Sequence, residues 1–203
     1  MFEKKAITSV PVNDLIARRW SGVSYNPGRP VEAEKLTACV EAARWALSCY
    51  GAQPWNFIIC DRSRDEAAWN TALDCLVEGN RGWARNAPVL ILAVAVERFK
   101  HNGEPNRWAQ YDTGAAAISL CLQATDPGLM AHQMGGFDAD KSIQAFDIAD
   151  DHTPMAMIAI GYQTAREDVP EERQEREFAP RKRNPVSEHF FFGRWGAGKD
   201  AAG

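Results

Sequence analysis

The sequence has few cysteines, few histidines and no long apolar run, and each shortage excludes a class of protein. Its 203 residues include no Cys-x-x-Cys pair and only five cysteines, Cys39, Cys49, Cys60, Cys75 and Cys121. This pattern favours free thiols in a reducing compartment over disulfides or a zinc site. The four histidines show no metal-ligand spacing, so no metal site is predicted.

The longest apolar run, residues 87–96, is too short to span a bilayer, and the first residues lack the apolar core of a signal peptide. We therefore expect a cytoplasmic protein without a membrane partner. The formal net charge of −4 gives no broad basic field, which argues against nucleic acid as a partner. The motifs GxSxG and GxGxxG are both missing, so neither a hydrolase elbow nor a dinucleotide fingerprint is present.

What the sequence does contain is an alternation of helical and strand patterns within the usual length of one domain. Helices are predicted at about 11–16, 32–47, 65–77, 108–124 and 138–146. Strands are predicted at 57–60, 88–96, 129–134 and 154–161, and polar loops at 78–86 and 97–106. This order predicts an α+β fold with residues 1–203 in a single domain.

Two further segments are predicted to contact a partner. In the helix from about 108 to 124, one stripe is formed by Trp108, Tyr111, Ala115, Ile118 and Leu122, and small alanines cover much of the rest. Such a helix is expected at the centre of the fold or at a subunit contact. Residues 163–180 are charged and almost free of large apolar side chains, so an extended arm or linker is predicted there. The phenylalanines at 190–192 would then need a surface to cover them.

The stretch Ala46–Phe57 joins a predicted helix to a predicted strand and allows two interpretations. Gly51 and Pro54 make it a rigid turn, and its polar and aromatic side chains could form the floor of a pocket for a flat, polar-edged ligand. Alternatively it is only a connection whose Trp55 packs in the core, which is the more common role of aromatic residues near turns. Cys49 has no basic neighbour in sequence and is expected to pack rather than react.

Arg18, Arg19, Trp20 and Ser21 follow the first helical pattern and lead into Gly22. Two guanidiniums, a hydroxyl and the backbone of a turn could together bind a phosphate group. The same arginines could instead be a solvated helix end that complements the helix dipole. The residues alone favour the second interpretation.

Several segments, taken together, resemble the nitroreductase family of flavoproteins. They are Arg19-Trp20-Ser21, the segment 44–55 with Gln53-Pro54-Trp55, Asn80 ahead of Pro88, Asp112-x-Gly114, Gly128-Leu129, Gly136-Phe137-Asp138, and the late basic pair Arg181 and Arg183. They occur in the order of the family and cover nearly the whole chain.

The resemblance implies a central, mostly antiparallel sheet flanked by helices, in an intertwined homodimer whose arm, at about 163–203, wraps the partner. It implies FMN as cofactor and NADH or NADPH as electron donor, with a nitroaromatic, quinone or similar small molecule as acceptor in a ping-pong reaction. A specialised enzyme on the same scaffold, such as a dehalogenase or dehydrogenase, and a non-catalytic flavin-binding relative are the alternatives.

The resemblance also assigns residues to the cofactor. The phosphate group would be bound by Arg19, Ser21, Arg181 and Arg183, with the neighbours Arg18 and Trp20. The isoalloxazine ring would be contacted from the partner subunit by Ser48, Cys49, Tyr50 and Gln53. Its pyrimidine edge would be met by Asn80, and its N5 by the segment Met134, Gly135 and Gly136, where the backbone N–H of Gly135 faces N5. No catalytic side chain is expected, because the flavin itself carries the chemistry.

Overall fold

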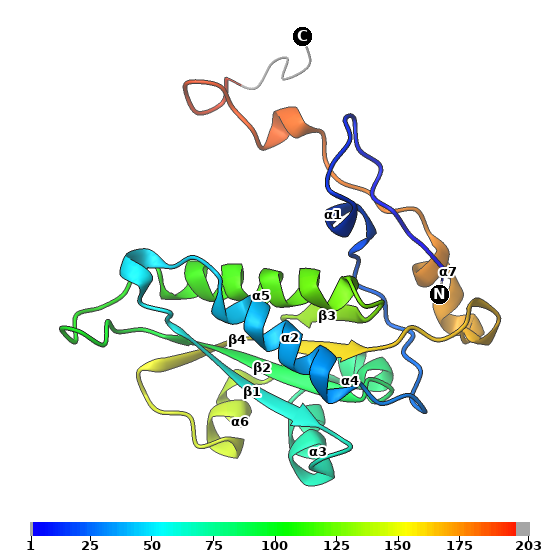
Figure 1. Ribbon diagram of the computed structural model, residues 1–203, viewed down its shortest axis with the longest axis horizontal. Helices are drawn as coiled ribbons and strands as arrows, with labels where there is room; N and C mark the ends of the chain where they lie inside the picture. Colours follow the sequence, from blue (N-terminus) through cyan, green and yellow to red (C-terminus); the bar gives the residue numbers. More distant parts are fainter. Residues whose placement is uncertain (1, 198–203) are drawn as a thin grey trace.

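The computed structural model describes residues 2–197, which form a four-stranded sheet with helices on both faces (Figure 1). The strands are β1 (Trp55–Asp61), β2 (Val89–Val96), β3 (Met130–Met134) and β4 (His152–Gly161). They lie in the order β1-β2-β4-β3, and every neighbouring pair is antiparallel. The predicted α+β fold with an antiparallel central sheet is confirmed.

The helices are α1 (Asp14–Arg18), α2 (Ala33–Arg44), α3 (Glu66–Asp74), α4 (Glu78–Ala84), α5 (Ala109–Thr125), α6 (Ala139–Ala145) and α7 (Glu171–Phe178). Helices α2 and α5 cover one face of the sheet, and α3 and α6 cover the other (Figure 1). Three of these helices begin where the sequence provides a cap. The side chains of Asn13, Asp65 and Asp138 each accept a backbone N–H of the first turn, which an isolated helix end would leave unpaired.

Strand β2 lies at the centre of the sheet and is buried at every residue. Its alternating side chains supply two separate cores. Leu90 and Leu92 pack toward α3, while Val89 and Ile91 pack toward α2 and α5. Because each fully buried aliphatic side chain contributes about 1.5–3 kcal/mol, this strand is a main source of stability. The prediction of an interior strand at 88–96 is confirmed.

The prediction of a polar loop at 78–86 is wrong, because α4 occupies most of it. Two glycines weaken this helix by about 1 kcal/mol each, which is why the sequence favours a loop. Tertiary contacts compensate for that loss. Trp83 is buried, and the Arg81 guanidinium donates to the carbonyls of Asp74 and Leu76 at 3.1 and 2.8 Å.

Several predicted helix limits are also wrong. Helix α1 begins at Asp14 rather than residue 11, and α2 ends at Arg44, so that Leu47 is exposed instead of buried. In α5 the large residues Tyr111 and Ile118 are exposed, because the alanine-rich side faces the sheet. Small side chains allow this helix to pack closely on α2 and the strands, and the bulky stripe is left on the outer surface.

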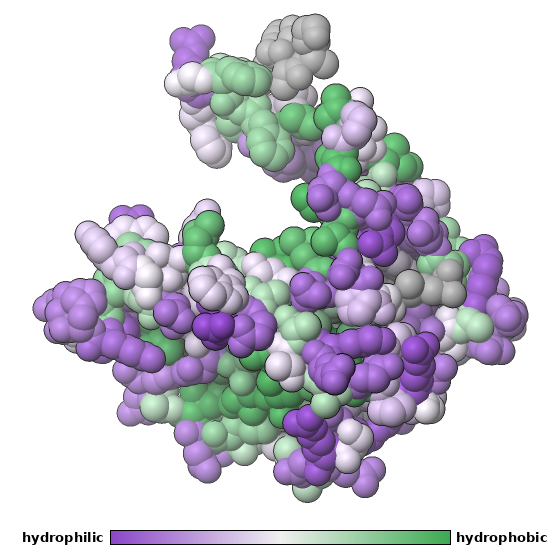
Figure 2. Space-filling model, in the orientation of Figure 1, coloured by the Kyte–Doolittle hydropathy of each residue, from purple (hydrophilic) through white to green (hydrophobic). Residues whose placement is uncertain are grey.

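The prediction of an extended segment at 163–180 is wrong for α7, which packs on its own chain. The buried carboxylate of Glu177 accepts the backbone N–H of Val23, and Phe178 packs against Phe2 with ring centroids 5.2 Å apart. Such contacts join residues far apart in the sequence, so local composition cannot reveal them. Beyond Arg181 the chain leaves the body, and Figure 2 shows an open gap beneath this segment. The rest of the predicted arm, residues 198–203, lies outside the described residues.

The buried carboxyl of Glu177 makes stability depend on pH. Burial raises its pKa above the ordinary value of 4.5, so the folded protein binds this proton more readily than the unfolded chain. The cost of burying the carboxylate is therefore present at neutral pH and is relieved as the pH falls through the folded pKa.

The variant Glu177→Gln keeps an acceptor for the N–H of Val23. We expect its unfolding free energy, compared with that of wild type, to be higher at about pH 7 than at about pH 4. Urea denaturation of both proteins at the two pH values measures the difference in unfolding free energy. A difference that does not change with pH would contradict the expectation.

Candidate functional site

The turn that follows α2 is held in place by the first turns of α5. The backbone N–H of Cys49 donates to the buried carboxylate of Asp112 at 2.9 Å. Within the turn, the N–H of Gln53 donates to the Ser48 hydroxyl at 3.0 Å. The polar side chains that the sequence places here thus build the turn, and α5 determines where it projects.

Tyr50 has a strained backbone and an exposed side chain, a combination that folding does not explain. Its φ is 53° and that of Gln53 is 48°, both in the left-handed region that costs a non-glycine residue about 1 kcal/mol or more. The Tyr50 ring is 86% exposed and contacts Phe99 edge to face, with centroids 6.1 Å apart. Trp55, by contrast, packs partly buried against the core. Strain of this kind is typical of ligand-contacting segments, so the turn is a candidate site and Trp55 is its structural anchor.

Glycine tests the strain directly. We expect Gln53→Gly to stabilise the protein by roughly 0.5–1 kcal/mol, because glycine adopts positive φ freely and the N–H bond to Ser48 is kept. The matched change is Ala52→Gly, at a residue with φ −67°, where the added backbone freedom costs about 0.5–1 kcal/mol. Thermal denaturation of the two variants should shift in opposite directions; shifts of the same sign would show that the turn is unstrained.

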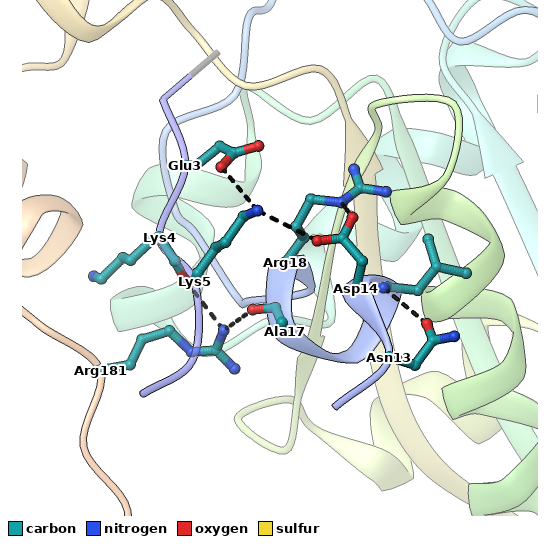
Figure 3. Close-up of polar contacts among 9 residues, drawn as sticks. Glu3, Lys4, Lys5, Asn13, Asp14, Ala17, Arg18 and Arg181 are labelled. Atoms are coloured by element: carbon teal, nitrogen blue, oxygen red, sulfur yellow. Dashed lines mark hydrogen bonds and ion pairs between the residues drawn. The ribbon is translucent and has the colours of Figure 1, made fainter. Parts of the chain in front are cut away.

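A second group of predicted residues lies at the end of α1. The Arg19 guanidinium donates to the Ser21 hydroxyl at 3.4 Å, so both groups are close enough to contact one phosphate. Arg18 instead pairs with Asp14 one helical turn earlier, with its Nε 2.5 Å from the carboxylate (Figure 3). Trp20 is partly buried. Arg18 and Arg19 both line the cavity at the end of α5, but only Arg18 is paired with a carboxylate.

Arg181 reaches the same region from the C-terminal side. Its guanidinium donates to the carbonyls of Lys4 and Ala17 at 3.1 and 2.7 Å (Figure 3). Burial, and then the positive charges of Arg19 and Arg183, lower the pKa of Arg181. In the described part of the chain no ion pair joins any of these three arginines to a carboxylate. Three neighbouring guanidiniums without a counter-ion suit an anionic ligand such as phosphate.

The third group is formed by Asn80 and the glycines that follow β3. The Asn80 amide donates to the carbonyl of Gly136 at 3.0 Å. A Cβ at Gly136 would lie 2.6 Å from that amide nitrogen, so only glycine allows this contact, whereas the space around Gly135 is open. Met134 is buried in the core, and its side chain is not available to a ligand. The exposed backbone of Gly135 beside Asn80 suits the edge of a flat, polar ring.

The second and third groups lie at the two ends of β3, whereas the turn lies at the other end of α5. Arg19 and Thr125 line a cavity of about 40 Å³ at the end of α5, whereas the turn is anchored at Asp112 near its start. At a rise of 1.5 Å per residue, these ends of α5 are roughly 20 Å apart. Figure 1 shows the turn and α1 at opposite ends of α5. Within one chain, the turn and the arginine group are therefore separate.

Sequence reasoning missed two residues that position these groups. Asp112 entered only as part of a motif, although an acidic residue on the buried side of an alanine-rich helix signals a hydrogen-bonding role. Lys4, whose carbonyl positions Arg181, gave no signal, because its contact spans nearly the whole chain.

Residues 16–162 match the profile of the nitroreductase family. The chain belongs to this family. The family predicted from the sequence motifs is thereby confirmed. A crystal structure described as an oxidoreductase containing FMN is 34% identical and has a TM-score of 0.87, with 96% of this chain and 98% of that chain covered.

Two other nitroreductase-family relatives are more distant. YodC of Bacillus subtilis, provisionally named an NAD(P)H nitroreductase, is 24% identical over 176 residues, which cover 73% of this chain and 87% of YodC. A nitroreductase family protein from Clostridium difficile 630 is 24% identical with a TM-score of 0.69, covers 89% of this chain and 97% of its own, and supports the fold alone.

The residues of this nitroreductase fit a flavin nucleotide. From Met130, which lines the cavity with Arg19, strand β3 leads to Gly135, a distance of roughly 17 Å at 3.3 Å per residue. Cations at one end and an open backbone beside Asn80 at the other suit an extended ligand with a phosphate and a polar ring. Among residues 2–197 no cluster of potential metal ligands occurs, and every helix is too short or too polar to cross a membrane.

Proposed function

We propose that this nitroreductase-family protein is an FMN-dependent NAD(P)H oxidoreductase that reduces a nitroaromatic, quinone or similar acceptor. The observation that carries the proposal is the group of arginines without counter-ions, Arg19, Arg181 and Arg183, one strand length from the open backbone of Gly135. The FMN named for the related crystal structure supports the choice of cofactor. The name of YodC supports NADH or NADPH as donor.

Each residue then has a defined task. Arg19, Arg181 and Ser21 bind the phosphate through charge-assisted hydrogen bonds, and Arg183 adds positive charge. Asn80, oriented by the carbonyl of Gly136, presents its amide to the ring edge. The backbone N–H of Gly135 donates to the ring at the reactive nitrogen, where no side chain obstructs a substrate. The flavin, when bound, supplies the hydride chemistry.

The protein acts as a homodimer in this proposal, because one chain carries only two half-sites. The outer stripe of α5, with Tyr111 and Ile118 exposed, is the surface on which a second copy packs. If the two α5 helices run antiparallel about a two-fold axis, the turn of one copy approaches the arginines of the other. The segment after Arg181, with Phe190 and Phe192 exposed, extends to the partner.

Donor and acceptor use the same open face beside Gly135, which predicts a ping-pong reaction. The first substrate must leave before the second can bind, and double-reciprocal plots should be parallel. The cytoplasmic location stays a prediction.

Colour tests the proposed function. The purified protein should be yellow and should bleach when NADH or NADPH is added without oxygen, and a quinone or nitroaromatic should restore the colour. A colourless protein that rejects added FMN would overturn the proposal. A yellow protein that neither donor reduces would be a flavin-binding relative without this activity.

A further inference from the structure

Two segments outside the residues that match the family, 2–6 and 176–183, meet beside the end of α1. The N–H of Ala6 donates to the carbonyl of Ala17 at 2.8 Å, which connects the N-terminal segment to α1. Lys4 contributes twice: its carbonyl accepts from Arg181, and its ammonium donates to the carbonyl of Arg176 at 2.9 Å. We call residues 2–6 and 176–183 together the clasp.

Aromatic contacts hold the clasp against the body. The Phe2 ring lies between Phe178 and Trp20, with centroids 5.2 and 5.9 Å away. The Lys4 ammonium stands over the Trp20 ring at 4.6 Å from its centroid. These contacts orient Lys4 and keep its charge on the side of the body that carries Arg19.

The clasp concentrates positive charge in a protein whose net charge is −4. Burial lowers the pKa of Lys4, the charge of Glu177 partly opposes this, and the charges of Arg181 and Arg176 lower it further. Burial and the charges of Arg19 and Arg183 lower the pKa of Arg181. The clasp contains two carboxylates. Glu177 accepts the N–H of Val23 and offsets part of the positive charge of Lys4 and Arg176, and Glu3 is paired with Lys5.

The other two acidic side chains at this place are held in ion pairs with other cations. Glu3 and Asp14 are paired with Lys5, and Asp14 also with Arg18 (Figure 3). The hydrogen bonds of the clasp thus hold Lys4, Arg176 and Arg181 together with Glu177 as partial compensation, and the remaining positive charge favours binding of an anion.

We infer that the clasp completes the phosphate site, with Lys4 as an additional phosphate-binding cation and with phosphate binding coupled to closure of the two chain ends. The ligand chemistry is a phosphoryl dianion, which FMN would supply; this choice of cofactor rests on the proposed function. Because coupling is reciprocal, the phosphate stabilises the contacts of Lys4 with Arg181 and Arg176, and those contacts hold the phosphate.

Two flavins that differ only by the phosphate test the role of Lys4. We expect Lys4→Gln to raise the dissociation constant of FMN about 10-fold, since a charge-assisted hydrogen bond is lost, and that of riboflavin less than about twofold. The matched control is Lys5→Gln, whose ammonium pairs only with Glu3 and Asp14 at the surface and should leave both constants unchanged. Equal FMN affinity in the two variants would overturn the inference.

Hydrogen exchange tests the coupling in the wild-type protein, without any variant. FMN and inorganic phosphate should each slow amide exchange in residues 2–6, including the bonded N–H of Ala6, whereas riboflavin should not. Protection by riboflavin equal to that by FMN, or none by phosphate, would overturn the inference. A wild-type protein that binds neither flavin but is protected by phosphate would overturn the proposed function. The inference that phosphate binds at the clasp would still be supported.

Discussion

Replacing Ile118 by aspartate is expected to convert the protein into monomers that no longer retain FMN. Ile118 is 42% exposed on the outer stripe of α5, next to Tyr111, which is 74% exposed. A carboxylate buried between two copies would be unpaired and would weaken association by on the order of 100-fold or more. Because the turn and Arg19 lie roughly 20 Å apart along α5, a monomer keeps only half of each site. FMN affinity should therefore fall together with dimerisation.

Sedimentation velocity measures the oligomeric state of Ile118→Asp, and quenching of flavin fluorescence measures FMN binding. Asn70→Asp is the matched control, since it adds the same charge to the exposed side of α3 on the opposite face of the sheet. It should remain dimeric and keep FMN. A folded, monomeric Ile118→Asp protein that binds FMN as tightly as wild type would show that one chain holds the complete site.

The second large effect is recovery of activity when two inactive variants are combined. Arg19→Gln removes the phosphate half-site, and Tyr50→Asp places a carboxylate in the turn, where the native ring is 86% exposed and the fold does not depend on it. Each variant alone should lose most of its bound FMN and activity. In a mixed dimer one site receives both changes and the other receives neither, because each site takes its half-sites from different chains.

Co-expression of the two variants in equal amounts should restore about a quarter of the wild-type activity, since half of the dimers are mixed and one of their two sites is intact. Two affinity tags allow the mixed dimer to be isolated and its FMN content measured. The double variant Arg19→Gln/Tyr50→Asp, expressed alone, should stay inactive. Mixed dimers without recovered activity would contradict a site shared between chains.

Much of the fold followed from local patterns. The continuous apolar run of β2 identified the central strand, and the helical patterns at 65–77 and 138–146 identified α3 and α6, where Asp65 and Asp138 cap the first turns. These features depend on the spacing of apolar side chains and on hydrogen bonds within one helical turn, and both can be read from neighbouring residues in the sequence. Helices α4 and α7 were missed for the opposite reason. The two glycines of α4 disfavour a helix, and α7 has almost no large apolar side chains that would signal burial. Their positions depend on Trp83 and Glu177, which are buried against distant segments.

For the candidate site, the sequence by itself determined the family and the chemical types of its residues. Arg19, Asn80 and Gly136 occur at spacings that identify the nitroreductase family without any coordinates. Only the tertiary structure decided which of them meet. It placed the strained turn on Asp112, at the far end of α5 from Arg19, and used the carbonyl of Lys4 to position Arg181. Contacts between residues more than 150 positions apart are set by packing of the whole chain, which no local pattern encodes.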